Sequence, residues 1–179
     1  MSGLPHLRER LVWTEDGSLR DGEIRYLLMR TDSLMQLFKR LDTAARLEAL
    51  QVFAESLAEN GRKSLETRMC RLNLTRDQLY DDLARSSATQ LGWGLWTFRR
   101  NASDRFEVDV VNSPFADGFG PADHPVCYPI AGMLSAMGEL VLGSPVDVKE
   151  TSCAANSNGC CRFTVICRSQ GAANSSLHE

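Results

Sequence analysis

The apolar residues of the first seventy positions change from one spacing to another. Asp16-Gly17 supplies a turn and residues 24–29 form a short apolar run, so the chain is expected to open with a hairpin. From Thr31 onward apolar residues recur three and four positions apart, which is typical of a helix. A longer helix is expected over residues 43–68, with Asn60-Gly61 bending or dividing it.

In the middle of the chain the helical period gives way to alternation. Thr75 with Gln78 matches a capping box, so a helix is expected to begin there and to end near Gly92. Residues 93–100 carry aromatic side chains, and residues 105–111 alternate between apolar and charged. Alternation of this kind predicts two half-buried strands that pair as a hairpin.

The last third of the chain predicts a loop, a helix and a final hairpin. Residues 113–125 are rich in Gly, Pro and Asp and are expected to cross the surface as a loop. Pro129 is well placed at the start of a helix that Gly143 ends, and strands are expected at 146–151 and 161–168. This order favours an α+β fold, with helices packed on an antiparallel sheet, over a doubly wound fold.

The composition is that of an ordinary globular protein. Hydrophobic residues make up 43% of the 179 residues and charged residues 24%, which suits one core. We therefore expect a single domain over residues 1–168 and a disordered tail over residues 169–179. The net charge of −3 provides no broad cationic surface, which argues against a nucleic-acid partner.

The expected location of the protein is the cytoplasm. No apolar run reaches the length of about 18 residues that a membrane-spanning helix needs. The start MSGLPHLRERLVW lacks the apolar core of a signal peptide. Thiols stay reduced in the cytoplasm, so a cluster of cysteines there favours metal or redox chemistry over a disulfide framework.

The six cysteines divide into two groups by position. Cys70 follows a helical segment and Cys167 lies in an apolar strand, so both are expected to be buried, inert thiols. The other group lies at the ends of regular elements beside loops and comprises Cys127, Cys153 and Cys161.

Glu150 lies three residues before Cys153. Three thiolates and a carboxylate are a workable tetrahedral set for zinc. Spacing alone leaves the alternative open, because no CxxC pair is present and a solvated loop can carry incidental thiols.

The stretch HPVCYPIAGMLSAMGELVLGSPVDVKETSCAANSNGCCRFTV resembles the 4-vinyl reductase domain family, and EIRYLLMRTDSLMQLFKRL resembles the start of that family more loosely. The family motif places a glutamate 23 residues after a cysteine, a second cysteine three further on and a third eight beyond, which are the intervals of Cys127, Glu150, Cys153 and Cys161. The resemblance implies that these four residues bind a structural Zn²⁺. Cys160 is an alternative to Cys161, and Cys161 is favoured.

The family includes the sensory domain of regulators that respond to phenol, toluene and xylene, and stand-alone proteins linked to bacteriochlorophyll synthesis. The resemblance implies a fold shared with nitric oxide sensors and Golgi transport subunits, a homodimer, and a small hydrophobic or aromatic ligand held between helices and sheet. The function it implies is that of a sensor or carrier. An accessory protein or reductase in tetrapyrrole synthesis, and a protein-interaction module without ligand, are the alternatives.

The aromatic residues of the first predicted hairpin are candidates for the ligand pocket. Trp93, Trp96, Phe98 and Phe106 are concentrated there, and further aromatic residues follow in the Gly-rich stretch. A place in the core is the other explanation for each of them.

The sequence leans against an enzyme. Four protein ligands leave zinc no open position for water or substrate. The chain carries neither a GxSxG nucleophile motif nor a GxGxxG cradle after a strand, and His124, the histidine near the metal ligands, is expected to be solvated.

Two local signals conflict in the last loop. Asn158-Gly159 is typical of a two-residue hairpin turn, which would place Cys153 opposite Thr164 and far from Cys161. Zinc binding requires both sulfurs side by side, and a structural zinc contributes on the order of 10 kcal/mol, far more than a turn preference. We therefore expect residues 154–160 to form a wide loop.

Overall fold

The main sheet is antiparallel and four-stranded, with the order β4-β5-β7-β6. The structure, a computed structural model, describes residues 7–86, 91–157 and 159–168. The strands of this sheet are β4 (Leu95–Ala102), β5 (Arg105–Val111), β6 (Val146–Ser152) and β7 (Cys161–Cys167).

The predicted alternation accounts for the two central strands. Val108 and Val110 of β5 are buried while the residues between them are partly exposed, and Phe163 of β7 is buried opposite Val108. Apolar side chains of neighbouring strands therefore share one face of the sheet.

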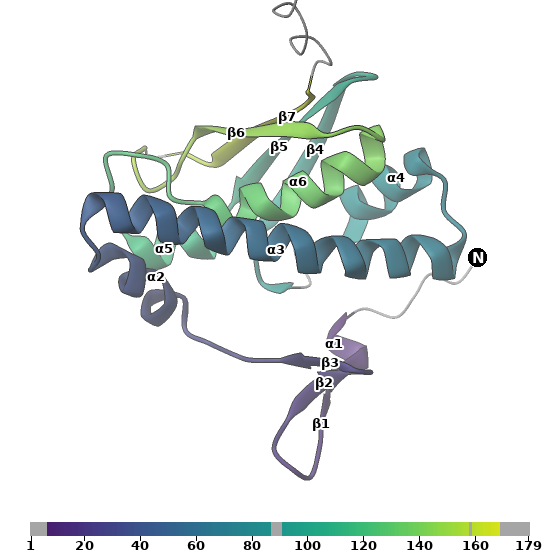
Figure 1. Cartoon of the computed structure of the whole chain (residues 1–179), viewed down its shortest axis with the longest axis horizontal. Coiled ribbons are helices and arrows are strands. Elements are labelled where there is room, and N and C mark those ends of the chain that lie inside the picture. Colours follow the sequence, from purple (N-terminus) through teal and green to yellow (C-terminus); the bar gives the residue numbers. More distant parts are fainter. Residues whose placement is uncertain (1–6, 87–90, 158, 169–179) are drawn as a thin grey trace, which may run out of the picture.

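Two helices form further layers on this buried face (Figure 1). Helix α6 (Tyr128–Leu142) lies against the sheet, and α3 (Thr43–Leu72) crosses the outer side of α6. A β-carbon at Gly132 would overlap the backbone of Ala54, and one at Gly138 would overlap the side chain of Val165. These two glycines allow α6 to approach α3 and the sheet closely.

Helix α3 is continuous, so the predicted bend or division at Asn60-Gly61 is wrong. Asp42 caps its start by accepting a hydrogen bond from the Ala45 N–H at 3.1 Å, and Asn73 ends it in the left-handed conformation with φ 49°. Gly61 costs a helix about 1 kcal/mol relative to alanine. Packing against α6 along the length of α3 outweighs that local cost.

The predicted loop over residues 113–125 contains a short buried helix, α5 (Pro114–Phe119). Ser113 caps it by accepting from the Ala116 N–H at 3.4 Å, and Pro114 occupies its first turn. Gly118 lies against the backbone of Thr31 at the start of α2 (Thr31–Lys39). The glycine that indicated a loop instead permits a close contact between two helices.

The capping box is confirmed at the start of α4 (Arg76–Ser86). The Thr75 N–H donates to Gln78 Oε1 at 2.9 Å, and the Gln78 N–H donates to Thr75 Oγ1 at 3.3 Å. The helix ends at Ser86, before the predicted end near Gly92, and residues 87–90 lie outside the described part of the chain.

The N-terminal segment forms a small three-stranded sheet of its own, which lies apart from the helices and main sheet in Figure 1. It comprises α1 (Leu7–Arg10), β1 (Val12–Trp13), β2 (Leu19–Asp21) and β3 (Ile24–Tyr26). The strand predicted over residues 24–29 ends at Tyr26, and the side chains of Leu27 and Leu28 are 76% and 72% exposed.

Two further predictions meet the limits of the described chain. The predicted disordered tail, residues 169–179, lies outside the described residues. None of the described helices combines the length and the apolar character that crossing a membrane requires.

Candidate metal centre

Three cysteines and one glutamate from distant parts of the chain meet at one end of the main sheet. Cys127 immediately precedes α6, Glu150 lies near the end of β6, Cys153 follows β6, and Cys161 begins β7. One potential ligand atom from each residue lies within 4.8 Å of the other three. We call these four residues the metal cluster. Its three cysteine side chains are fully buried.

The sulfur separations suit a tetrahedral metal ion. Cys127 Sγ lies 3.9 Å from Cys153 Sγ and 3.5 Å from Cys161 Sγ. Zinc–sulfur bonds of about 2.3 Å at tetrahedral angles place two sulfurs about 3.8 Å apart. The thiols are therefore already close to the spacing that zinc requires.

Glu150 provides the most specific indication of a missing cation. Its Oε2 accepts a hydrogen bond from the Cys127 N–H at 3.0 Å, whereas its Oε1 is buried and has no partner among the described residues. Burial, followed by the negative charge of Cys153, raises the pKa of Glu150 to about 8. A buried carboxylate oxygen without a partner is costly, and a metal ion would satisfy it.

The thiol groups also favour a bound cation. Hydrogen bonds with Cys153 and Cys161, together with burial and the nearby Glu150, raise the pKa of Cys127. The same contacts lower the pKa of Cys153, which accepts hydrogen bonds from both other thiols. Four acidic groups this close cannot all ionise without a cation, because their negative charges repel one another. A divalent metal removes that restriction, so the donor set fits zinc.

The pairing of β6 with β7 brings Cys153 beside Cys161. Thr164 pairs with Lys149, not with Cys153 as a two-residue turn would require. A β-bulge between Glu150 and Ser152 adjusts the register just before the cluster. The wide connection predicted for a metal loop therefore agrees with the observed register, although Asn158 itself lies outside the described residues.

Hydrogen bonds hold this loop on the cluster. Ser157 Oγ donates to the Cys153 carbonyl at 2.8 Å, and the Ala154 N–H points at Cys161 Sγ from 3.4 Å. The Ala122 N–H donates to the Ala155 carbonyl at 2.9 Å, which ties the loop to the chain before α6. Cys160 does not contribute to the metal cluster.

The aromatic residues predicted as a ligand pocket pack mainly on one another. Phe98 of β4 and Phe106 of β5 are stacked with ring centroids 6.0 Å apart, and Trp96 lies 6.1 Å from Phe98. Tyr80 of α4 contacts Phe98 and Phe106 edge-on at 5.8 and 5.6 Å. We call Tyr80, Trp96, Phe98 and Phe106 the aromatic cluster. Phe106 is only 1% exposed.

Trp93 lies outside this cluster. Its ring meets Phe115 of α5 at 4.9 Å and nearly at right angles, and its carbonyl accepts the Trp96 indole N–H at 3.0 Å. Tyr80 was not predicted from the sequence. Helical spacing identified its neighbour Leu79 as apolar core, and only the packing of α4 on the sheet shows where the Tyr80 ring lies.

Residues 106–167 match the vinyl-4-reductase domain family. The match contains the complete metal cluster and the strands and helix that position it. This segment belongs to that family. No protein among the curated sequences matches the chain significantly.

The vinyl-4-reductase segment and the elements before it share their fold with solved structures. The phenol-responsive sensory domain of the transcription activator PoxR, solved with phenol, is 22% identical and has a TM-score of 0.72; the match covers 89% of this chain and 86% of that one. Subunit 3 of a trafficking protein particle complex from Naegleria fowleri, covalently bound to palmitic acid, is 11% identical with a TM-score of 0.53, over 78% and 95% of the two chains.

A vinyl-4-reductase family protein from Methanocaldococcus jannaschii is 16% identical, with a TM-score of 0.42 over 75% of this chain and 88% of that one. The first two likenesses confirm the predicted α+β fold with helices on an antiparallel sheet.

The prediction of inert, buried thiols outside the metal cluster is wrong for both residues. Cys70, before the vinyl-4-reductase segment, is exposed on α3, and Cys167, at its end, is partly exposed. Cys167 does share the strand side of Phe163 and Val165, but it is the last residue of β7, where the covering helix gives less protection. Alternation identifies the side of a strand, not how far along the strand the cover extends.

Proposed function

We propose that the chain is a zinc-stabilised domain that binds a small hydrophobic or aromatic molecule, as a sensor or carrier. The observation that carries the metal site is the buried Glu150 Oε1, which has no partner among the described residues and lies beside three thiol groups. Ligand binding is supported by the aromatic cluster and by the fold shared with a sensory domain solved with phenol.

In this proposal zinc is structural. Cys127, Glu150, Cys153 and Cys161 would supply four protein ligands and leave no open coordination position. Bound zinc would join the start of α6 to the ends of β6 and β7, which are far apart in sequence. A cytoplasmic location fits this role, because thiols stay reduced and able to bind metal there. The proposed role is binding, not catalysis.

The ligand is proposed to bind at the aromatic cluster, between α4 and strands β4 and β5. Tyr80 makes edge-on contacts with two rings of the sheet, the geometry that aromatic ligands also prefer. An aromatic molecule that replaced the Tyr80 ring there would keep the same kind of contact. Trp93, which lies beside α5, is proposed to complete the wall nearest Phe115.

A thermal-shift panel on the zinc-loaded protein tests ligand binding. Phenol, toluene, a tetrapyrrole and a fatty acid would be compared, because a ligand that binds only the native state raises the melting temperature. Phe98→Ala should remove the shift. Phe53→Ala is the matched control, since Phe53 stacks on Phe38 at 5.7 Å, away from the aromatic cluster. If no compound raises the melting temperature, the proposed ligand site is wrong.

We also propose a homodimer in which the N-terminal segment packs on a second copy. That segment presents apolar side chains that the rest of the described chain leaves uncovered, with exposed fractions from 46% to 76%. Apolar surface of this kind marks interaction sites. Its residues are Val12, Trp13, Ile24, Leu27, Leu28 and Met29.

Light scattering tests the dimer. The double variant Leu27→Ser and Leu28→Ser should shift the protein to monomer at micromolar concentration, because it removes two apolar side chains from the proposed contact. Val52→Ser, on the exposed side of α3 at 58% exposure, is the control and should leave the dimer intact. A wild-type protein that is already monomeric would contradict the proposal. A dimer without any ligand response would favour the protein-interaction module instead.

A further inference from the structure

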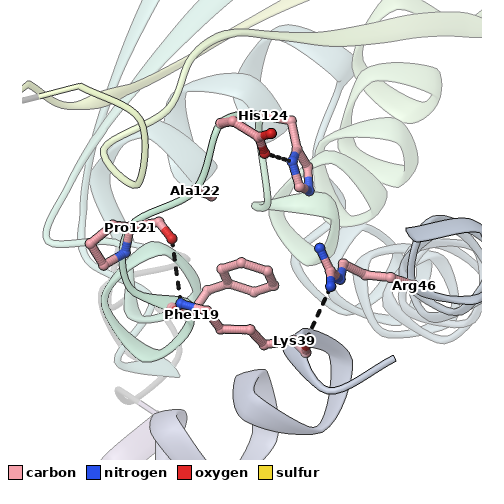
Figure 2. Close-up of a pocket in the computed structure, with 7 residues that line it drawn as sticks. Lys39, Arg46, Phe119, Pro121, Ala122 and His124 are labelled. Atoms are coloured by element: carbon pink, nitrogen blue, oxygen red, sulfur yellow. Dashed lines mark hydrogen bonds and ion pairs between the residues drawn. The ribbon is translucent and has the colours of Figure 1, made fainter. Parts of the chain in front are cut away.

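A second pocket lies away from the aromatic cluster, where α2 ends and α3 begins (Figure 2). Its volume is about 500 Å³. The ring of Phe119 lies in the middle of the drawn residues, with Lys39, Arg46 and His124 around it. Pro121 and Asp123 from the segment after α5 complete the wall.

Two cations in this pocket have no anionic partner at ion-pair distance. The Lys39 ammonium and the Arg46 guanidinium approach the Phe119 ring, at 5.1 and 5.8 Å from its centroid, and both side chains are partly buried. Within the described ranges no carboxylate forms an ion pair with either cation. This is unusual in a chain whose net charge is −3.

Both cations contact only neutral acceptors. Lys39 Nζ donates to the carbonyls of Phe119 at 2.8 Å and Pro121 at 3.4 Å. Arg46 donates through Nε and Nη2 to three carbonyls at the end of α2, the shortest bond being 2.8 Å to Leu41. Its Nη1 has no acceptor among the described residues. The positive charges are thus held in place without being neutralised.

His124 presents a third polar group to the same space. Its Nδ1 contacts the Asp123 carboxylate at 2.5 Å, and its ring meets Phe119 edge-on at 6.3 Å. Its Nε2 is buried and has no hydrogen-bond partner in the part of the chain that the structure describes. The expectation that His124 is solvated is therefore wrong for this nitrogen, because the ring packs on Phe119.

Asp123, the acidic residue of the lining, compensates the cations only weakly. Its side chain is 95% exposed and contacts His124. The charge of Arg46 is the last and smallest of the influences that lower the pKa of Asp123, after the hydrogen bond from His124. Water screens a charge that is this exposed, so the pocket stays cationic.

We propose that this pocket binds a small oxyanion, the carboxylate or phosphate group of a small molecule, between Lys39, Arg46 and His124. The Arg46 Nη1 and the Lys39 ammonium would donate to its oxygens, and His124 Nε2 would gain the partner it lacks. This site is separate from the proposed aromatic-ligand site, and the two proposals can fail independently.

The alternative is that Lys39 and Arg46 serve only to brace the chain after α5 against α2. Their hydrogen bonds to backbone carbonyls would then be their whole function, and water would solvate the charges. This alternative predicts that removing Lys39 lowers stability and leaves anion binding unchanged, so the two explanations are distinguishable.

Isothermal titration of the zinc-loaded protein with four probes tests the proposal. Benzoate and inorganic phosphate carry an oxyanion, benzyl alcohol is a neutral analogue, and benzylamine carries the opposite charge. Binding of both anions identifies a bare oxyanion as the ligand group, and binding of benzoate alone identifies an organic acid. Binding of neither anion, or equal binding of benzyl alcohol, would overturn the proposal.

Variants then locate the binding. Lys39→Gln and His124→Ala should each weaken anion binding about tenfold, the scale of one hydrogen bond to a charged group. Arg40→Gln is the matched control, because it removes a neighbouring, exposed cation at the same helix end that does not line the pocket. Wild-type anion affinity in Lys39→Gln, with or without a lower melting temperature, would reduce Lys39 to a brace and refute the site.

Discussion

Replacing Gly132 by alanine would add one methyl group where α6 crosses α3. A β-carbon there would lie 2.7 Å from the carbonyl carbon of Ala54 and 2.8 Å from its Cα, closer than the 3.0 Å that real β-carbons respect. Both contacts are with backbone atoms of a 30-residue helix. A side-chain rotation therefore cannot relieve them, and the two helices must move apart.

Two opposing effects set the size of the change. Overpacking in a tight core costs up to about 3 kcal/mol, and a backbone contact belongs at the upper end of that range. Alanine in place of glycine inside a helix returns about 1 kcal/mol. The net loss of unfolding free energy should be about 2 kcal/mol, which lowers the melting temperature by roughly 4–8 °C in a domain of this size.

Urea unfolding of the zinc-loaded protein measures this loss, with Gly61→Ala as the control. Gly61 lies in the same helix interface, but its β-carbon would meet the side-chain sulfur of Met133 at 3.0 Å, and that side chain is flexible. Gly61→Ala should therefore be neutral or stabilising. If Gly132→Ala were as stable as the wild type, close packing of α6 on α3 would not be the reason for glycine at this position.

Two further predictions concern the metal cluster and the sheet. Cobalt substitution should produce thiolate-to-metal absorption indicative of three sulfurs, which Cys153→Ser reduces and Cys70→Ser, an exposed thiol, leaves unchanged; equal spectra for wild type and Cys153→Ser would contradict the ligand set. Hydrogen bonds from Arg99 and then Arg162 lower the pKa of Asp109, so its stabilising contribution is present above the ordinary aspartate pKa and is lost as pH falls through the lower folded value. Asp109→Asn should thus cost about 1 kcal/mol in urea unfolding at pH 7, and the difference from wild type should shrink in acid; a constant difference would exclude that ion-pair network as its source.

Local patterns were sufficient for much of the chain. Alternation along residues 105–111 identified the buried face of β5, and the capping box at Thr75 located the start of α4. The intervals among Cys127, Glu150 and the later cysteines indicated the metal ligands before any geometry was known. Each of these features depends on neighbours in sequence or on a short motif, so the linear chain contains the information.

Local patterns failed where a distant segment decided the outcome. Glycine-rich composition predicted a loop at residues 113–125, but Gly118 is required there for contact with α2. Asn60-Gly61 predicted a break that packing on α6 prevents. Asn158-Gly159 favoured a tight turn, yet the observed strand register places Cys153 beside Cys161.

The sequence by itself thus determined the types of the main elements and the residues able to bind a metal. The tertiary structure alone decided that Tyr80 joins the aromatic cluster, that Cys70 is exposed, and that Lys39 and Arg46 meet His124 around Phe119. Periodicity reports which side of a helix or strand avoids water, because that depends on residues a few positions apart. Which segment covers that side, and which charges it leaves unpaired, depends on contacts between residues some eighty positions apart, such as Lys39 with Phe119.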